Sequence, residues 1–565
     1  YLKETPGLLK LVRMLGPALL VCLGQWALGK TLVHQEQQPW LQLMLSIVPV
    51  LWGFLLLRFA LPPVSAALWV LVVDLALHLA HHTKSALTGE PLSWSDLSQT
   101  ENLGIVGQYI TVTQTALTLA LLLGLVVWTR HEARQPYLRT RLLSRTLWWL
   151  LLGPLALQPW WPQASTHLAR WLSHPPTRYV QWNWASNVQA NGLPLHLLQT
   201  SKRPMPGRAS AQEQAAFAQL QTPQAQSVPA RPSHIITILC EACWHDARLF
   251  RDAFAPLRAQ GMREFRAISP AYGGGTVNAA FEMLTGLPSR GVLSGIIYQE
   301  YKTLLSPQAW AWPRQLHQQG YKSVAIHNHA RTFWQRHVVN PKLGFDTFLG
   351  REDLQIEDPA YFADDRYLFD AAWQQLQSHP GQPMFMHLTT VYTHGPYPAE
   401  NDHGERNYAR RLTRTLQQTA AFVHKVTQRY PDTLILLVGD HKPALTRYLY
   451  ANGVLTARQF EATGDSNESF VFDLEHLQEE VVGDVPGYIY HRDAQQVQNY
   501  LRRIQGLPMF CMTQIADELF VRSGLPAFEY ARQQGLCDGD PRLSYEDTVA
   551  RYPSWLYQQS LFAAH

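Results

Sequence analysis

The residues best suited to chemistry lie just beyond two strongly apolar runs of the chain. Glu241 follows the run HIITIL of residues 234–239, and Asp440 and His441 follow the run TLILLV of residues 433–438. A carboxylate and an Asp-His pair at the tips of two buried strands form a suitable set of ligands for a divalent metal ion. We therefore predict a metal site that contains Glu241, Asp440 and His441.

A fourth candidate, Thr276, lies in the glycine-rich segment AYGGGTVN of residues 271–278, which is typical of a turn that opens a helix. Backbone N–H groups and the helix dipole stabilise an anion at a helix amino terminus. A hydroxyl there that also touches a metal ion can ionise near neutral pH and attack a phosphoryl group. Each motif is weak by itself, because the glycines can serve only as a turn and cap and Asp-His pairs are common. Together they predict Thr276 as a further metal ligand and as the nucleophile.

The elements expected to position these residues alternate along the second half of the chain. Strand-like runs lie at residues 234–239, 322–326, 383–388 and 433–438. Helical stretches lie near residues 277–284, 307–319, 361–376 and 407–429. Continuous apolar runs are buried on both faces, as in a parallel sheet covered by helices. The alternation predicts an α/β sandwich whose active residues lie at the carboxyl ends of the strands.

The first third of the chain differs in composition from the rest. Of the 565 residues, 46% are hydrophobic and 16% are charged, against about 25% charged in ordinary soluble domains. A membrane helix needs about 20 apolar residues, and five apolar stretches precede residue 162. They occupy residues 8–28, 41–59, 64–79, 103–128 and 142–161. We predict an α-helical membrane domain of five spans in residues 1–161, which excludes a wholly soluble enzyme.

Basic residues predict how these helices are oriented. Arg130, Arg134, Arg139 and Arg141 follow the fourth stretch, and short loops rich in Lys and Arg lie on the cytoplasmic side. With the amino terminus inside, five crossings place everything after residue 161 outside the cytoplasm. We therefore predict a multi-pass protein of the bacterial inner (cytoplasmic) membrane with a periplasmic, extracytoplasmic catalytic domain. The net charge of +4 is too small for a polyanion-binding surface, so no nucleic acid partner is expected.

Two further domains are expected after the membrane part. Residues 162–232 are predicted to form interfacial helices and a flexible linker, and residues 233–565 a catalytic domain with a carboxy-terminal extension. The third apolar stretch carries Asp74 and three histidines toward its end. We favour a polar helix end that reaches the lipid headgroups, and a lipid or proton path is the alternative.

The cysteines of the catalytic domain fall into two pairs. An extracytoplasmic compartment permits disulfides, so Cys511 and Cys537 can pair and close a loop near the carboxyl end. Cys240 and Cys243 have the CxxC spacing of redox and zinc sites. Because Cys240 ends a buried strand and no second CxxC occurs, we favour packing or a local disulfide over a metal role.

Residues from about 233 to 525 resemble the alkaline phosphatase/sulfatase superfamily, specifically its branch of lipoteichoic acid synthases and related phosphoglycerol and phosphoethanolamine transferases. The segments that carry the resemblance are IITILCE (235–241), GGGTVNAAFEMLTG (273–286), HNHARTFWQR (327–336), THGPY (393–397) and GDHKP (439–443). A five-span anchor before an external catalytic domain also resembles this family. The resemblance implies that a divalent ion, Mn²⁺ or Zn²⁺, is held by Glu241, Thr276, Asp440 and His441.

Five more residues are expected to handle the substrate. By the same resemblance, Trp334 and Arg336 match residues that hold a phosphoglycerol headgroup, and His394 matches a histidine beside the transferred phosphoryl group. Arg336 offers a planar fork of donors for phosphate oxygens, and His394 can donate and accept a proton. His329 stands where the family tends to place an acidic residue, and Lys442 can contact phosphate or point to solvent. A surface ion pair for Arg336, a packed aromatic for Trp334 and a loop hydrogen bond for His394 are the alternatives.

These predictions combine into a membrane-anchored, metal-dependent phosphotransferase. Thr276 attacks the phosphodiester of a phospholipid, diacylglycerol leaves, and a hydroxyl of an extracytoplasmic glycan or glycolipid takes the headgroup from a phosphothreonine intermediate. The donor favoured by Trp334 and Arg336 is phosphatidylglycerol, with phosphatidylethanolamine as the alternative and phosphodiester hydrolysis as a further one. A sulfatase needs a Cys or Ser in a CxPxR-like stretch, which Thr276-Val277-Asn278 lacks. A degenerate lipid sensor is disfavoured because all four metal-ligand positions are filled.

Overall fold

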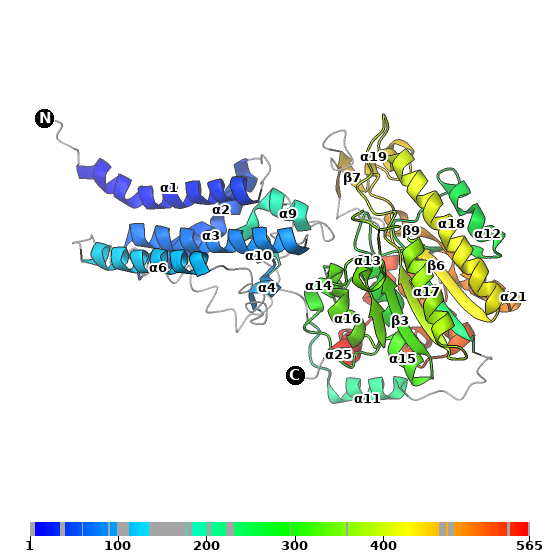
Figure 1. The fold of residues 1–565 in the computed structure, drawn as a ribbon. Helices are drawn as coiled ribbons and strands as arrows, with labels where there is room; N and C mark the ends of the chain where they lie inside the picture. Colours follow the sequence, from blue (N-terminus) through cyan, green and yellow to red (C-terminus); the bar gives the residue numbers. More distant parts are fainter. Residues whose placement is uncertain are drawn as a thin grey trace. The chain divides into compact units, whose positions relative to one another are not determined.

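The structure is a computed structural model of the whole chain. It describes residues 6–33, 40–58, 60–88, 91–98, 112–134, 177, 184–200, 205–221, 231–293, 295–357, 360–462, 470–472, 479–539 and 543–562. The chain divides into two compact units, residues 1–203 and residues 204–565. In their described parts the first unit is helical and the second combines a sheet with helices (Figure 1).

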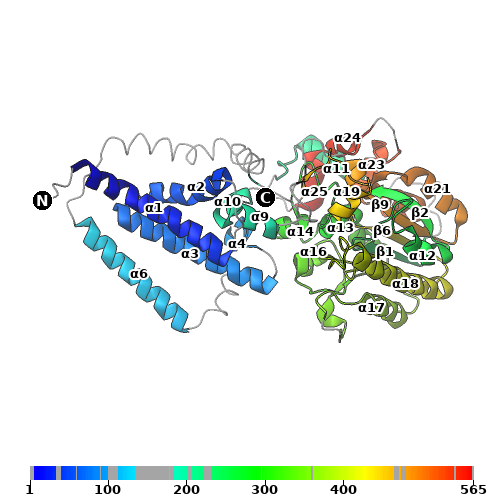
Figure 2. The ribbon, with the colours of Figure 1, turned by 90° about the horizontal axis from the view of Figure 1, so that it is seen from above.

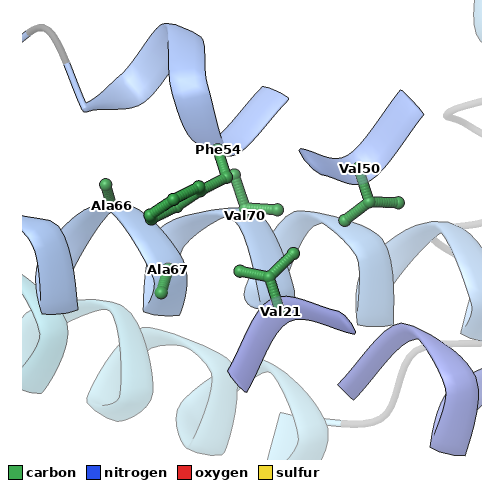
Figure 3. Close-up of a cluster of buried hydrophobic side chains, with 6 residues drawn as sticks. All are labelled: Val21, Val50, Phe54, Ala66, Ala67 and Val70. Atoms are coloured by element: carbon green, nitrogen blue, oxygen red, sulfur yellow. The ribbon is translucent and has the colours of Figure 1, made fainter. Parts of the chain in front are cut away.

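The first unit packs its helices around small and branched apolar side chains. Its described helices are α1 (Pro6–Leu32), α2 (Trp40–Leu57), α3 (Pro63–Thr88), α4 (Trp94–Ser98), α6 (Val112–Ala133), α9 (Trp184–Asn191) and α10 (Leu193–Gln199). Helices α1, α2 and α3 contact one another. Figure 3 shows the side chains buried between them, namely Val21, Val50, Phe54, Ala66, Ala67 and Val70. The two alanines let the neighbouring helices approach α3 closely.

One described helix is long and apolar enough to cross a membrane. It is the segment Pro63–His82 of α3, and the apolar segment Leu43–Leu57 of α2 is shorter. The third apolar stretch, predicted to be short, is thus the clearest span, because α3 continues through its polar residues to Thr88. The fifth predicted stretch, residues 142–161, lies outside the described residues, as does the first part of the fourth. The amino-terminal region is therefore helical with one clear apolar span, and five spans are not shown.

The polar residues of α3 are packed inside the helical unit. Asp74 and His78 are buried, and Nδ1 of His78 lies 3.2 Å from Oδ1 of Asp74. Gln25 of α1 is also buried, with its side-chain amide beside the Asp74 carboxylate. The polar residues that were expected near the lipid headgroups are thus enclosed by protein in the helical unit.

The second unit is organised around one eight-stranded sheet with the order β10-β2-β9-β6-β1-β5-β3-β4. These strands are β1 (His234–Cys240), β2 (Arg263–Ile268), β3 (Lys322–His327), β4 (Thr347–Leu349), β5 (Met384–Thr389), β6 (Thr433–Gly439), β9 (Asp484–Tyr490) and β10 (Leu507–Pro508). The strands from β6 to β4 run parallel, whereas β9 is antiparallel to both of its neighbours. The short strands β7 (Phe460–Ala462) and β8 (Phe470–Phe472) form a separate antiparallel pair.

Helices cover both faces of the large sheet (Figures 1 and 2). One face carries α12 (Ala255–Ala259), α17 (Arg366–Ser378) and α18 (Glu405–Arg429), and the other carries α13 (Thr276–Thr285), α15 (Trp312–Gln318) and α22 (Met509–Ala516). The remaining described α-helices are α11 (Ala211–Leu220), α14 (Ile297–Tyr301), α16 (Arg336–Lys342), α19 (Thr446–Ala451), α20 (Glu479–Val482), α21 (Ala494–Ile504), α23 (Pro526–Gln533), α24 (Tyr545–Ala550) and α25 (Ser554–Leu561). Because β1, β5 and β6 are covered on both sides, every residue in them is buried, as their continuous apolar sequences predicted.

The four predicted strands are confirmed as β1, β3, β5 and β6. The sequence analysis misses β2, whose sequence REFRAI is rich in charge, and β9, which contains Pro486 and Gly487. Such residues are depleted in strands, and tertiary pairing overrides that preference here. Two helices are also shorter than predicted, since α15 begins at Trp312 and α17 at Arg366.

The carboxy-terminal part of the second unit contains the predicted disulfide between Cys511 and Cys537. The two residues are 26 positions apart, so replacing both by alanine is expected to lower the free energy of unfolding by about 3.5 kcal/mol through loop-closure entropy. Thermal unfolding of the detergent-solubilised full chain measures the effect. Cys22, which is unpaired, supplies the matched control Cys22→Ala, and an equal shift in both variants contradicts a stabilising role for the cross-link.

Candidate functional site

Three predicted metal ligands meet at the carboxyl ends of the central strands. Ligand atoms of Glu241, Asp440 and His441 all lie within 4.8 Å of one another, and the three side chains are buried. Nε2 of His441 lies 3.4 Å from Oε1 of Glu241 and 3.2 Å from Oδ2 of Asp440. The chain therefore has a buried candidate metal site where the sequence predicted one.

The register of β1 and β6 explains why these residues meet. The two strands pair in parallel with Cys240 opposite Gly439, so the next residue of each strand emerges at the same level of the sheet edge. The N–H of Asp440 donates to the carbonyl of Cys240 at 3.1 Å. A side chain at Gly439 would collide with the carbonyl of Cys243. The close approach of the two strand ends thus depends on a glycine at this position.

A disulfide closes the turn that carries Glu241. Cys240 and Cys243 are bonded to each other. Of the two alternatives favoured from the sequence, packing or a local disulfide, the structure has the disulfide. The backbone N–H of Glu241 donates to Oγ1 of Thr390 at 2.9 Å, and the hydroxyl of Thr393 donates to the carbonyl of Glu241. These two hydrogen bonds tie the turn to the loop after β5, and they fix the backbone position from which the Glu241 carboxylate extends.

Hydrogen bonds orient the ligand atoms toward one point. Nδ1 of His441 lies 2.8 Å from the carbonyl of Lys442, so that nitrogen carries a proton and Nε2 is the ring atom left for a metal ion. Oδ1 of Asp440 accepts from the N–H groups of Ala242 at 2.6 Å and of His441 at 2.8 Å. His441 Nε2 and Asp440 Oδ2 are buried without a hydrogen-bond partner among the described residues. Converging lone pairs of this kind fit a bound cation.

The electrostatics of the cluster also favour a cation. Burial raises the pKa of Asp440, as does the charge of Glu241, to about 7. For Glu241, burial acts upward on the pKa, but the positive charges of His394 and His441 and the hydrogen bond from Thr276 lower it to about 2. For His441, burial acts downward, yet the two carboxylates raise its pKa to about 9. The carboxylates of Glu241 and Asp440 repel each other at this distance, and a divalent ion bound between them would offset their negative charge.

Thr276 joins the same cluster. It is the first residue of α13, it is buried, and its hydroxyl donates to Oε2 of Glu241 at 2.9 Å. Gly275 before it has a φ of 89°, a left-handed conformation that glycine adopts without strain. The turn therefore delivers the hydroxyl to the cluster at a helix amino terminus, and all four predicted ligands are brought together.

His394 lies in the loop after β5. Its Nδ1 atom is 2.6 Å from the carbonyl of Gly395, so the loop hydrogen bond considered from the sequence forms, and it leaves Nε2 for other contacts. The imidazole stacks on Phe362 with ring centroids 4.3 Å apart. Its charge also lowers the pKa of Glu241, which places His394 in electrostatic contact with the cluster.

Arg336 is the buried first residue of α16. Its Nη1 atom donates to the carbonyl of Phe333 at 3.3 Å, and among the described residues no carboxylate forms an ion pair with it. Burial lowers the pKa of Arg336 to about 10, against the opposing effects of Tyr298, Glu241 and Asp440. The surface ion pair considered from the sequence is thus absent, and the guanidinium lies within the field of the two cluster carboxylates.

Trp334 and His329 lie in the segment before α16. Trp334 is half-buried with a φ of 54°, a strained value for a bulky residue, and its ring lies 5.4 Å from that of Phe333. His329 is buried with its ring 4.6 Å from Phe333. Burial, together with the charges of Arg336 and His394, lowers the pKa of His329 to about 4. In this environment the His329 imidazole is uncharged near neutral pH.

Lys442 is buried, and its ammonium contacts backbone carbonyls. Only 1% of its surface is exposed. Its Nζ donates to the carbonyls of Val481, Val482 and Asp484 at 2.8, 3.1 and 2.6 Å. All three ammonium donors are thus used on backbone oxygens, and burial lowers its pKa to about 7. The solvent-facing alternative for Lys442 is therefore wrong, because its ammonium binds carbonyls at the end of α20 and at the start of β9. A contact between Lys442 and a substrate phosphate stays a prediction.

Sequence reasoning missed Asp365, which supports the loop that carries His394. Oδ1 of Asp365 accepts from the N–H of Val391 at 2.9 Å and from Nδ2 of Asn328 at 3.0 Å, and Oδ2 accepts from Thr415 at 2.6 Å. These contacts join the end of β3, α18 and the loop after β5. The sequence predicted residues 361–376 as helix, so no pattern signalled that Asp365 turns inward before α17 begins.

Comparison with known families identifies the class of this domain. Residues 234–499 match the Sulfatase family. The second unit therefore carries a domain of the sulfatase/alkaline phosphatase superfamily, as the sequence segments predicted. The chain is also distantly similar in sequence to lipoteichoic acid synthases.

Two curated relatives and one solved structure illustrate these likenesses. A Rhizobium meliloti protein named for cyclic beta-1,2-glucan modification is 27% identical over 315 residues, which cover 51% of this chain and 48% of that protein. The lipoteichoic acid synthase of Staphylococcus saprophyticus is 28% identical over 151 residues, covering 22% of each chain. The chain thus spans about half the length of the first relative and less of the second. The phosphoglycerol transferase GacH of Streptococcus pyogenes, solved with sn-glycerol-1-phosphate, aligns with a TM-score of 0.38 at 18% identity, over 69% of this chain and 99% of that one.

Proposed function

We propose that this protein transfers a phospholipid headgroup, phosphoglycerol from phosphatidylglycerol, to a hydroxyl of an extracytoplasmic glycan or glycolipid. The observation that carries the proposal is the Thr276 hydroxyl at the start of α13, hydrogen-bonded to Glu241 within the buried cluster. The names of the two curated relatives support it, since one concerns glucan modification and the other lipoteichoic acid synthesis. The favoured acceptor is accordingly a β-glucan of the cell envelope.

The proposed ligands of the metal are Glu241, Thr276, Asp440 and His441, whose oxygen and imidazole donors suit Mn²⁺ or Zn²⁺. Such an ion supplies positive charge that lowers the pKa of a hydroxyl and offsets the charge of a phosphodiester. The chain's own contribution is to bury these groups, to hold His441 in one tautomer through Lys442, and to set the hydroxyl at a helix amino terminus, where N–H groups stabilise its anion.

In the first proposed half-reaction, Oγ1 of Thr276 forms a bond to phosphorus as the bond from phosphorus to the diacylglycerol oxygen breaks. The hydroxyl proton passes to Glu241, which already accepts it in a hydrogen bond. The departing alkoxide takes a proton from His394, whose Nδ1 is engaged with Gly395, so Nε2 is the donating atom. The product is phosphoglycerol esterified to Thr276.

In the second half-reaction the acceptor hydroxyl gives its proton to Nε2 of His394 as its oxygen bonds to phosphorus. The bond between Thr276 and phosphorus breaks, and Oγ1 regains the proton held by Glu241. Atoms and charge balance over the two steps, and His394 returns to its starting state. The same two reaction steps with water as the acceptor give the phosphodiesterase side reaction.

Arg336 is proposed to bind the phosphate oxygens of the donor, and Trp334 to pack against its glycerol carbons. Replacing Arg336 by lysine keeps the charge but loses the planar fork, so we expect kcat/KM for the donor to fall about 10- to 100-fold. The matched control is Arg406→Lys, at an exposed arginine of α18. Steady-state assays with phosphatidylglycerol measure the effect. Equal kcat/KM values in both variants would show that Arg336 does not bind the donor.

The membrane arrangement belongs to the same proposal. A five-span anchor in residues 1–161, a connector in residues 162–232 and a catalytic domain in residues 233–565 would hold the active site outside the cytoplasm, near lipid headgroups. The clear apolar span in α3 supports an anchor. Fusing a reporter that is active only outside the cytoplasm to the carboxyl terminus tests the orientation.

The donor is tested with purified full-length protein and two radiolabelled lipids. We expect label from the glycerol headgroup of phosphatidylglycerol to appear on the protein and then on added cyclic β-1,2-glucan. Label transferred only from phosphatidylethanolamine overturns the donor, and label released into water with or without glucan makes the enzyme a phosphodiesterase.

A further inference from the structure

Tyr361 is an unusual surface residue of the second unit. It is 64% exposed, and in the described part of that unit Met205 is the other strongly exposed large apolar side chain. A single exposed ring needs no explanation by itself. Tyr361 differs because other rings support it from behind and connect it to the candidate active site.

These rings form a continuous series. The ring of Tyr361 lies 4.9 Å from that of His329 and 4.8 Å from that of Phe362, both edge-on. Phe362 in turn stacks on His394 at 4.3 Å. Two ring contacts therefore lead from the exposed face of Tyr361 to the imidazole that is proposed to accept the proton of the incoming hydroxyl.

The backbone beneath the exposed ring is fixed. Nη1 of Arg351 donates to the carbonyl of Ala360 at 2.8 Å and to that of Tyr361 at 3.0 Å. Phe362 is half-buried, and the next residue, Ala363, is fully buried. Tyr361 is thus presented on an anchored turn before α17, so its ring needs little ordering when a ligand binds.

The surrounding charge indicates the kind of ligand. The segment 351–357 is net acidic, because the exposed residues Glu352, Asp353 and Glu357 outnumber Arg351. Arg331 pairs with Asp353, and its backbone N–H donates to Glu352. An anionic lipid surface is repelled by such a segment, and a membrane-contacting patch would contain several adjacent apolar side chains. A sugar ring has an apolar C–H face that can cover an aromatic ring, and hydroxyls that can donate to carboxylates.

We infer that Tyr361, backed by Phe362 and His329, is the stacking platform for a sugar ring of the acceptor glycan. Bound there, the saccharide presents a hydroxyl toward His394. The inference rests on the proposed function, because it assigns the acceptor half of that reaction. It also adds a claim of its own, namely that the glycan binds through this tyrosine whether or not transfer follows.

The kinetic test compares Tyr361→Ala with Tyr361→Phe in the full chain, with cyclic β-1,2-glucan as acceptor. Loss of the ring is expected to raise KM for the glucan about tenfold, the effect of one lost aromatic contact. KM for phosphatidylglycerol should stay at the wild-type value. Tyr361→Phe keeps the ring and should stay within about twofold of wild type. An unchanged KM for the glucan in Tyr361→Ala, or an equal rise for the lipid, overturns the inference.

A binding measurement separates this inference from the proposed function. Calorimetric titration of the detergent-solubilised full chain with cyclic β-1,2-glucan should show binding that Tyr361→Ala weakens about tenfold. If the wild-type protein shows this binding but no headgroup transfer, the platform is supported and the proposed reaction is refuted. If the glucan binds neither protein, or both equally, the platform is wrong. Weaker binding of Tyr361→Ala to phosphatidylglycerol vesicles with unchanged glucan binding would assign the ring to lipid and also overturn the inference.

Discussion

Replacing Thr276 by alanine is expected to lower headgroup transfer by at least about 1,000-fold, because removing a nucleophile leaves only the binding and charge effects of the site. The fold should survive, since the change removes one hydrogen bond to Glu241, worth about 1–3 kcal/mol. Radiolabelled phosphatidylglycerol measures turnover. Mass spectrometry of wild-type protein incubated with the lipid should find a phosphoglycerol group on the peptide that contains Thr276 and none in the variant.

Thr276→Ser is the matched control, because it keeps the hydroxyl at the start of α13 and removes one methyl group. We expect it to retain the covalent adduct and measurable transfer. Circular dichroism and metal content, determined for both variants, separate a lost nucleophile from a lost fold or a lost metal. Transfer by Thr276→Ala at more than a tenth of the wild-type rate, with no adduct found in wild type, would refute the nucleophile assignment.

The central geometry of the site could be predicted from the sequence because it follows from strand topology. The runs that became β1 and β6 are buried and parallel, and parallel strands end at the same edge of a sheet. Residues placed just after them, Glu241 and Asp440, had to lie close together. Thr276 followed from the glycine turn, since a helix that starts beside this edge points its first residue at it.

Side-chain directions set by distant segments could not be predicted. Lys442 follows a metal-ligand position, yet its ammonium binds carbonyls of Val481, Val482 and Asp484. Those acceptors lie at the end of α20 and the start of β9, a strand that the sequence pattern missed. The position of Tyr361 was hidden for a similar reason, because the sequence pattern predicts a helix over residues 361–376, whereas α17 begins at Arg366 and Tyr361 lies exposed before it.

In the amino-terminal helical region, the sequence pattern predicted the positions of helices but not the packing of their polar residues. Apolar length located the helices α1, α2, α3 and α6, but it gave the third stretch only residues 64–79, with Asp74 and histidines toward its end. In the structure the helix continues past them, and the Asp74–His78 pair is buried against neighbouring helices. Packing between helices determines whether a polar residue ends a helix or is enclosed by the bundle, and composition alone does not record that packing.

The second large effect is expected at the metal cluster. Replacing His441 by alanine removes one ligand and leaves Glu241 and Asp440 facing each other, so bound metal per chain should fall and transfer should drop at least about 100-fold. Treating the wild-type protein with a chelator should abolish transfer, and adding back Mn²⁺ or Zn²⁺ should restore it. The ion that restores the faster rate identifies the working metal.

The matched control is His424→Ala, since His424 lies on the exposed side of α18 and contacts Gln260. It should keep wild-type metal content and activity. Saturating metal should also raise the thermal midpoint of the wild-type chain, because an ion at 100 times its Kd stabilises the folded state by about 2.7 kcal/mol, and His441→Ala should lose that shift. Two results would show that this site does not bind the catalytic cation. One is wild-type protein that transfers headgroups at full rate after complete metal removal, and the other is a His441→Ala variant that keeps one ion per chain.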